Sequence, residues 1–357
     1  MVVIKDLSAD AEKNVSERPT LERIAYEGAI GRARTTELYN MFYKNGPGNG
    51  TMLSLPFDQL IEHGVGHALK WEESANSKVV IELANRGDFS LLVLSIGQAE
   101  KYQNLIRADL PLLVKVDGHF LIGNEVNYPR HSNISSVERA VRAGANAIGC
   151  TFYLGGEETE QDVERVAEII EDAHRFEKPV FVWAYARGPF VDKMGADSLY
   201  WCAQGISAAE SLGADVVKQK FPVPVKGEKG EAYKMNLSKG GYLHSKMPEI
   251  DQLLELEPEN PDDVSSELHV KRLSFMSQVA PNILKIISGG PKGSEGGLLK
   301  TLKCVMDSGI EGQIIGRNLW GRPIEEALNL NSRMVNIMRE EHYHRKLTEP
   351  RFTGRYE

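Results

Sequence analysis

The sequence contains few cysteines, no long hydrophobic run and no excess of positive charge. Its three cysteines, Cys150, Cys202 and Cys304, lie far apart without the short spacings of a metal site, which is typical of reduced thiols. No stretch is apolar over the length that a signal peptide or a bilayer span needs, so we expect a cytoplasmic protein without a membrane partner. The formal net charge of −8 and the isoelectric point near 5.7 argue against a nucleic-acid partner.

Short apolar runs alternate with longer amphipathic segments along the 357 residues, of which 41% are hydrophobic. The apolar runs have the length of buried strands, and the amphipathic segments have the period of a helix. About eight such pairs in succession are typical of an α/β fold, the (β/α)8 TIM barrel, with a doubly wound open sheet as the alternative. The predicted strands are residues 51–57, 91–95, 111–117, 147–154, 179–185, 215–221, 283–287 and 313–315. The predicted helices are residues 77–86, 99–107, 135–144, 160–176, a helix that ends at 212, 298–307 and 325–339.

Three segments fall outside this alternation. Residues 1–48 are polar and end at the glycine-rich breaker 45–50, so we expect an N-terminal helical extension packed on a barrel of residues 49–340. A polar insertion of about residues 222–261 follows the sixth predicted strand, where a long loop of a barrel serves as a lid or a subunit contact. Residues 341–357 form a polar C-terminal tail that we expect to pack loosely.

A lysine lies inside the sixth predicted strand, in the run Gly213-Ala-Asp-Val-Val-Lys-Gln-Lys-Phe221. Burial of an ammonium group without a partner is costly and lowers its pKa. An amine with a lowered pKa can attack a carbonyl group and form a Schiff base, whereas a lysine at the end of a strand can instead reach solvent. Lys218 and Lys220 share one face of the strand, so their spacing alone does not tell which of them is the nucleophile.

Polar side chains also stand at the ends of other predicted strands, where barrel enzymes carry their catalytic residues. Asp58 follows the first strand, and Tyr185 lies at the end of the fifth. A lysine, a phenol and a carboxylate favour a class I aldolase, in which the Schiff base accepts the electrons of a breaking C–C bond. Tyr185 would then move the proton, and Asp58 would orient the hydroxyl group. The remaining polar residues at these ends are Lys115, Asp117 and His119 on one face of the third strand, and Trp183 and Arg187 on the face of Tyr185.

Glycine-rich turns follow the last two predicted strands, at Ser288–Lys292 and Gly316–Asn318. Such turns expose backbone N–H groups next to a helix start, where an oxyanion binds, and Arg317 can add a charged hydrogen bond. The sequence therefore predicts a phosphorylated substrate.

Five motifs together resemble the archaeal-type class I fructose-1,6-bisphosphate aldolases, in their bacterial branch, over about residues 50–340. They are Leu55–Gly64, Val182–Gly188, Ala214–Lys220, Ser288–Lys292 and Ile315–Trp320. The resemblance implies the barrel fold and a homo-oligomer. It also implies reversible cleavage of fructose 1,6-bisphosphate to dihydroxyacetone phosphate and glyceraldehyde 3-phosphate, in glycolysis or gluconeogenesis. The only covalent group expected is the lysine imine with the substrate, with no metal and no cofactor.

The resemblance also implies roles for single residues. Lys218 would be the Schiff-base lysine, Tyr185 the general acid and base, and Asp58 and Trp183 would lie around the reacting carbons. Arg187 would be near one phosphate. The other phosphate would lie on Ser288, Gly289, Gly290, Gly316 and Arg317, and the further substrate contacts that we expect are Gln59, His63, Lys115 and Lys220.

Several other functions remain open at this point. On the same scaffold, a transaldolase-like hept-6-ulosonate synthase or a thiolase would keep the barrel and the lysine and change the substrate. A barrel that binds phosphosugars without catalysis is a second alternative. A metal-dependent class II aldolase is a third, but His63, His67, His119 and His131 show no spacing of metal ligands.

Overall fold

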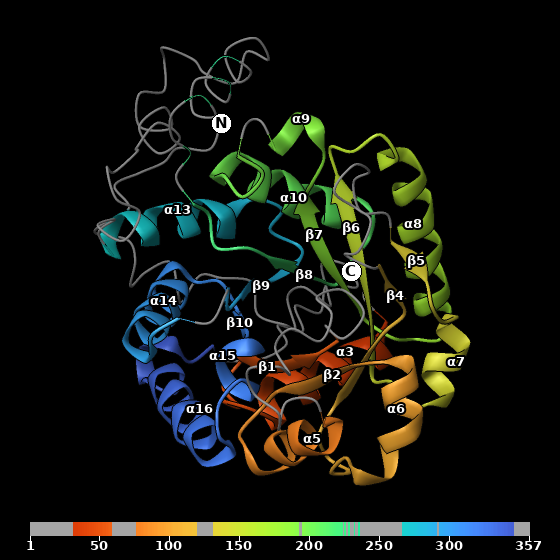
Figure 1. The fold of residues 1–357 in the computed structure, drawn as a ribbon, viewed down its shortest axis with the longest axis vertical. Helices are drawn as coiled ribbons and strands as arrows, with labels where there is room; N and C mark the ends of the chain where they lie inside the picture. The colour runs from red at the N-terminus through yellow and green to blue at the C-terminus, as the bar shows by residue number, and fades with distance from the viewer. Residues whose placement is uncertain are drawn as a thin grey trace, which may run out of the picture.

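Eight parallel strands form a closed barrel in the order β1-β10-β9-β8-β7-β6-β3-β2 (Figure 1). The computed structural model describes residues 31–58, 76–119, 131–192, 195–223, 225, 228, 232, 235, 266–290 and 293–345. Because β1 is hydrogen-bonded to both β10 and β2, the sheet has no free edge. This closure confirms the predicted barrel and excludes the open sheet. The barrel strands are β1 (Met52–Phe57), β2 (Leu91–Ser95), β3 (Leu112–Lys115), β6 (Ala147–Leu154), β7 (Val180–Ala186), β8 (Val216–Gln219), β9 (Leu284–Ser288) and β10 (Gly312–Ile314).

The strands form where the sequence is apolar on both faces, as parallel strands in a barrel require. Alternate residues of each strand face the barrel interior and the surrounding helices. In β1, Met52 belongs to the interior cluster, whereas Leu53, Leu55 and Phe57 pack with residues of the helices. The barrel is therefore filled with side chains below its mouth, so a site can form only at the ends of the strands.

Helices surround the barrel on its outer side (Figure 1). The amphipathic segments fold as helices because one face of each can cover the apolar outer side of the strands. Side-chain caps fix several starts, among them Asn76 before α5, Ser136 before α7 and Ser294 before α14. The helices are α5 (Ser77–Arg86), α6 (Ile96–Tyr102), α7 (Val137–Arg142), α8 (Thr159–Arg175), α9 (Pro189–Asp192), α10 (Leu199–Ser211), α13 (Ser266–Gln278), α14 (Glu295–Ser308), α15 (Arg317–Trp320) and α16 (Ile324–Met338).

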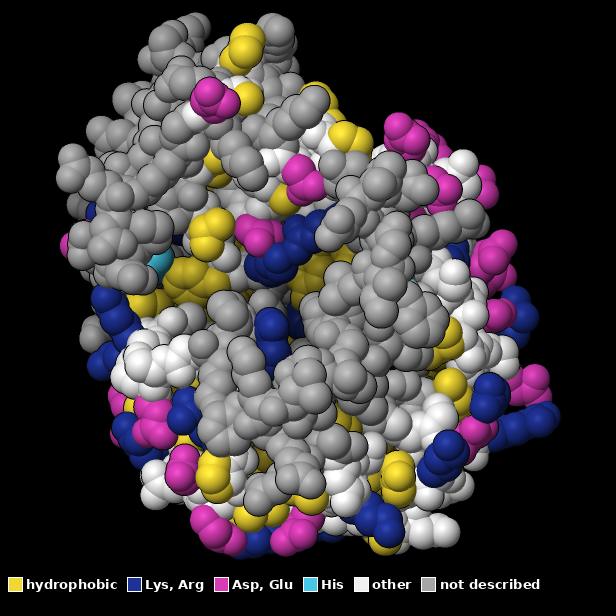
Figure 2. Space-filling view, in the orientation of Figure 1, with side chains coloured by type: hydrophobic (Ala, Val, Ile, Leu, Met, Phe, Trp, Pro, Cys, Tyr) yellow, Lys and Arg dark blue, Asp and Glu magenta, His cyan; other side chains and the backbone are white. Residues whose placement is uncertain are grey.

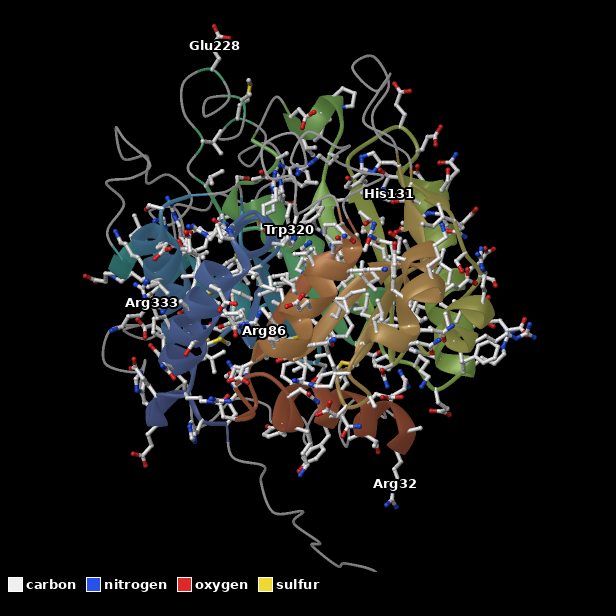
Figure 3. The ribbon with its side chains drawn as sticks, turned by 60° about the horizontal axis from the view of Figure 1, so that its bottom comes forward. Arg32, Arg86, His131, Glu228, Trp320 and Arg333 are labelled. Carbon is white, nitrogen blue, oxygen red and sulfur yellow. The ribbon has the colours of Figure 1, made fainter. Side chains whose placement is uncertain are left out.

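A short N-terminal element closes the end of the barrel that lies opposite the mouth. It consists of α3 (Arg32–Tyr39) and the π-helical turn η1 (Asn40–Lys44), and its Leu38 and Phe42 belong to the interior cluster. Arg34 of α3 pairs with Asp215, which immediately precedes β8, so the element lies at the N-terminal ends of the strands. Figure 3 shows Arg32 of this helix at the opposite end of the molecule from His131.

The structure departs from the predicted strand 111–117. The barrel strand ends at Lys115, and Asp117–Gly118 forms β4, which pairs antiparallel with β5 (Ser132–Asn133). The Asp117 carboxylate accepts the N–H of Thr151 at 2.7 Å, and this bond draws the chain out of the barrel. The helix α13 was not predicted, nor were the short helices α9 and α15.

The C-terminal tail is held more firmly than we expected, over its first five residues. They include the 3-10 turn η5 (Glu341–Tyr343), and Tyr343 is 2% exposed. Arg345 forms an ion pair of 2.8 Å with Glu311, which anchors the chain under the barrel. Most of the expected insertion 222–261, of the N-terminal extension and of the tail lies outside the described residues, so the domain boundaries stay predictions. Among the described helices, none is long and apolar enough to cross a membrane.

Candidate active site

Lysine and arginine side chains gather in a hollow at the centre of the face shown in Figure 2, beside hydrophobic side chains. One lysine of the barrel mouth is Lys218, which β8 holds between Trp183 of β7 and Ile286 of β9 in the strand register. Lys218 is 8% exposed. Its Nζ lies 4.9 Å from the centre of the Trp183 ring and 6.0 Å from the centre of the Tyr185 ring. An amine and a phenol thus lie side by side on the inner face of neighbouring strands.

Lys220 has different surroundings, although it shares a strand face with Lys218. It follows the end of β8, and its Nζ is 2.7 Å from Oδ2 of Asp197. The pKa of Lys220 lies below its ordinary value because burial and the neighbouring Arg187 outweigh the attraction of Asp197. The structure therefore separates the two lysines, which the spacing could not: Lys218 lies against the Trp183 ring, whereas Lys220 forms an ion pair at the rim.

Asp197 links Lys220 to Arg187. Its Oδ1 is 3.0 Å from Nη1 of Arg187, and the guanidinium carbon of Arg187 lies 5.5 Å from the centre of the Tyr185 ring. Burial opposes ionisation of Asp197, but Lys220 and Arg187 hold the pKa of its carboxyl below the usual range. The sequence analysis missed Asp197, because it lies between α9 and α10 and follows no strand.

Tyr153 places a second phenol next to Tyr185. The two residues are in register across β6 and β7, and their ring centres are 6.4 Å apart. On its other side, the Tyr153 ring meets the ring of His131 at 4.7 Å. The sequence analysis missed Tyr153 as well. It lies at the end of the fourth predicted strand, and a polar residue at a strand end was the signal that identified the other candidates.

Two histidines of the mouth form a pair that the sequence did not indicate. The sequence showed no metal-ligand spacing among the histidines and gave no sign that two of them would meet, but His119 Nδ1 and His131 Nε2 are 3.1 Å apart. The β4–β5 pairing brings them together across a gap of twelve residues in sequence. Among the described residues, no group of three or more His, Cys, Asp or Glu side chains is placed to hold a metal ion.

Lys115 belongs to a buried ion-pair network. Its Nζ is 3.1 Å from Oδ1 of Asp117, and Arg165 of α8 reaches Oδ2 of the same carboxylate at 2.9 Å. Lys115 is 1% exposed and Asp117 is 2% exposed. Burial raises the pKa of Asp117, but Lys115, His131 and Arg165 together bring it below its ordinary value. The charge of Lys115 is thus engaged by a carboxylate, and its expected contact with the substrate stays a prediction.

The two glycine-rich turns lie next to each other across β9 and β10. The N–H of Gly289 donates to the carbonyl of Ile314 at 2.9 Å, and the Asn318 side chain bonds the backbone of both Gly289 and Gly293 at 2.9 Å. Gly290 has a φ of +66°, which only glycine adopts without strain. Gly316 precedes α15, which begins at Arg317. The expected phosphate turns are therefore adjacent.

Asp58 directly follows β1 and is 6% exposed. The turn after β10 is tied to β1, since Nε1 of Trp320 donates to the carbonyl of Pro56 at 2.9 Å. Gln59, His63 and His67 lie outside the described residues.

Comparisons with known proteins agree on one group. The family described as DeoC/LacD family aldolase matches residues 52–322. The fructose-bisphosphate aldolase class 1 of Thermoproteus tenax is 28% identical over 302 residues, covering 84% of this chain and 93% of that protein. An archaeal fructose-1,6-bisphosphate aldolase, solved with its catalytic lysine bound to the carbinolamine intermediate, aligns with a TM-score of 0.66. It is 26% identical, and the alignment covers 85% of this chain and all of that one. The 2-amino-3,7-dideoxy-D-threo-hept-6-ulosonate synthase of Halobacterium salinarum is 32% identical, but over 115 residues, which are 32% of this chain and 42% of that protein.

Proposed function

The chain belongs to the DeoC/LacD family of aldolases, and we propose that it reversibly cleaves fructose 1,6-bisphosphate through a Schiff base on Lys218. The class I aldolases that it resembles work through a catalytic lysine. One observation carries the choice of residue: Lys218 is 8% exposed in the barrel mouth and its Nζ lies 4.9 Å from the Trp183 ring, whereas both lysines lie near the Tyr185 ring. Lys220 is held by Asp197 at 2.7 Å, and an ammonium in an ion pair is a poor nucleophile.

The proposed reaction begins when Nζ of Lys218 attacks the C2 carbonyl carbon of the open-chain sugar. The resulting carbinolamine loses water and becomes an iminium ion, which makes the neighbouring C3–C4 bond weak. Tyr185 accepts the proton of the C4 hydroxyl group as this bond breaks, glyceraldehyde 3-phosphate leaves, and the electron pair moves into the iminium to form an enamine. Tyr185 donates the proton to C3, and water hydrolyses the imine to release dihydroxyacetone phosphate. Asp58 orients the C4 hydroxyl group.

The two phosphate groups would lie on opposite sides of Lys218. We assign the C1 phosphate to the turns after β9 and β10, with Ser288, Gly289, Gly290, Gly316 and Arg317 as its contacts. We assign the C6 phosphate to the pair of Arg187 and Lys220, and we call this pair the distal subsite. The proximity of the two turns and the two cations at one rim support this arrangement. For Gln59, His63 and Lys115 a contact with substrate stays a prediction.

Borohydride trapping tests the proposal. Wild type, Lys218→Met and Lys220→Met are incubated with fructose 1,6-bisphosphate or dihydroxyacetone phosphate and EDTA, reduced, and analysed by intact mass and peptide mapping. We expect an adduct on Lys218 that only Lys218→Met removes, and no effect of EDTA. An adduct on Lys220 would identify that residue as the nucleophile instead. The absence of any adduct in folded wild type would refute the Schiff-base mechanism.

A second candidate has one observation in its favour. The partial match to the hept-6-ulosonate synthase of Halobacterium salinarum has a higher identity, 32%, than the longer aldolase match. That candidate uses the same lysine, so trapping alone does not exclude it. Steady-state cleavage of fructose 1,6-bisphosphate separates the two, because the synthase reading predicts no turnover of this substrate into triose phosphates.

A further inference from the structure

The carboxylate of Asp197 has no part in the aldolase steps above, yet it lies at the barrel mouth. Its two oxygens contact two cations, Arg187 Nη1 at 3.0 Å and Lys220 Nζ at 2.7 Å. Both cations also lie over the Tyr185 ring, at 5.5 Å and 5.6 Å from its centre. A single carboxylate therefore bridges the whole distal subsite, beside the phenol that we assign to proton transfer.

Among the described residues, Asp197 is the one carboxylate that forms an ion pair with either of these two cations. Burial and the charge of Arg187 hold the pKa of Lys220 below its ordinary value in spite of Asp197. The side chains of Arg187 and Lys220 are 22% and 30% exposed, so water screens them only in part. A half-buried pair of cations that shares a single described carboxylate favours the binding of a further anion.

The backbone of Asp197 is fixed, whereas its carboxylate is within reach of solvent. Its carbonyl oxygen accepts the N–H of Val223 at 2.9 Å, and it directly precedes Ser198, the N-cap of α10. The side chain of Asp197 is 32% exposed. A change of its χ1 rotamer would therefore carry the carboxylate away from the cations without movement of the loop.

We propose that Asp197 is the internal counterion of the distal subsite and that it sets the affinity and selectivity of this subsite for phosphate. In the empty site its two oxygens bridge a guanidinium and an ammonium as two phosphate oxygens would. The phosphate group of the substrate competes for the same N–H donors, so each binding event displaces the carboxylate and each release restores it. The inference rests on the proposed function, because it takes the distal group of the substrate to be a phosphate.

Such a counterion lowers the affinity of the distal subsite for anions and also makes this subsite selective among them. A phosphate dianion carries more charge than a carboxylate and can replace it, because both cations then gain a stronger partner. A ketose with an uncharged hydroxyl group at this end gains no ion pair in exchange for the one it would break. Asp197 therefore discriminates between bisphosphate and monophosphate sugars, and it keeps the bisphosphate from binding so tightly that product release slows.

Inorganic phosphate is the probe, titrated into wild type and into Asp197→Asn by isothermal calorimetry. The amide keeps the size of the side chain and removes its charge, and we expect Kd for phosphate to fall about tenfold at a partly solvated site. The double variants Asp197→Asn/Lys220→Met and Asp197→Asn/Arg187→Met locate the effect, since each is expected to abolish the gain. Asp197→Glu keeps the charge and is expected to bind phosphate like wild type.

Glu100→Gln is the matched control, because it removes a carboxylate that Arg139 binds at 2.7 Å on the outer helix α6. It is expected to leave Kd unchanged. An unchanged or higher Kd in Asp197→Asn would overturn the inference, since Asp197 would then only orient Arg187. Borohydride trapping of the same variants reports separately on the aldolase chemistry. Loss of trapping in wild type with the gain in affinity intact would refute the proposed function alone, whereas trapping without the gain would refute only the role of Asp197.

Discussion

Two buried lysines at the ends of barrel strands have opposite surroundings. Lys115, at the end of β3, is 1% exposed and lies 3.1 Å from the Asp117 carboxylate. Lys218, in β8, is 8% exposed and lies against the rings of Trp183 and Tyr185. In sequence both appear as a lysine in an apolar strand, so burial alone does not distinguish them. The difference teaches that burial alone does not characterise a lysine of the mouth: Lys115 takes part in a carboxylate network, and Lys218 lies against aromatic rings.

The two sides of the barrel mouth differ in the same way. On the β3–β6 side, Asp117 joins Lys115 and Arg165 into a network that also accepts the N–H of Thr151. Such a buried network fixes the chain and costs much to break. On the β7–β8 side, the ion pairs of Asp197 lie at the rim and are about one third exposed, so that their partners can be exchanged. We infer that the first side supports the mouth and that the second side reacts.

The substitution Lys218→Met is the strongest test of this comparison. Methionine fills a similar volume and removes the amine, so we expect cleavage of fructose 1,6-bisphosphate to fall at least about a thousandfold. The melting temperature should stay the same or rise, because a buried amine is replaced by an apolar side chain. A coupled assay for triose phosphates and a thermal melt by circular dichroism measure both. Activity near that of wild type would break the comparison.

The same substitution at Lys115 is expected to act on stability. Lys115→Met leaves the buried Asp117 carboxylate with one cation fewer, which we expect to cost about 3 kcal/mol of unfolding free energy. Lys220→Met is the matched control at the rim, where the loss of a partly exposed ion pair should cost less than about 1 kcal/mol. Urea unfolding followed by fluorescence gives both values. Equal losses at the two positions would show that the two sides do not differ in their energetic role.

We expect acid to weaken the ion pairs of Asp117 and thereby to lower the free energy of unfolding. The folded pKa of Asp117 lies below its ordinary value of 3.8, so the contribution of this carboxylate is complete above that pH and is lost as the pH falls through the folded pKa. Below about pH 4 the wild type should therefore lose more stability with falling pH than Asp117→Asn, which lacks this titration. The melting temperatures of wild type and Asp117→Asn are measured across this pH range, and an equal fall in both proteins would contradict the expectation.

The barrel was predictable because its strands are buried on both faces and read as continuous apolar runs. The predicted bounds 91–95 and 147–154 are those of β2 and β6. The strand 111–117 was predicted too long, because Lys115 and Asp117 continue its alternation. In the structure the barrel strand ends at Lys115, and Asp117 contacts Arg165 and the N–H of Thr151, residues that lie far from it in sequence.

The candidate site was predictable only where it lies on strands. Strand ends gather at one face of a barrel, so Lys218 and Tyr185 could be brought together from their positions alone. Asp197 could not, because it lies between two helices and meets Lys220 through a contact that no local pattern encodes. The histidine pair depends likewise on the antiparallel pairing of β4 and β5, two strands of two residues each, which carry too little sequence to be recognised.

The smallest expected effect belongs to Tyr153, the second phenol of the mouth. Its ring lies between those of His131 and Tyr185. Tyr153→Phe keeps the ring contacts, so we expect KM for fructose 1,6-bisphosphate to rise only about threefold, with kcat nearly unchanged. Tyr185→Phe is the control and should lower kcat about a hundredfold or more, as loss of a general acid and base does. A comparable fall of kcat in Tyr153→Phe would instead make both phenols part of the proton transfer, and the reacting side of the mouth would then extend from β8 to β6.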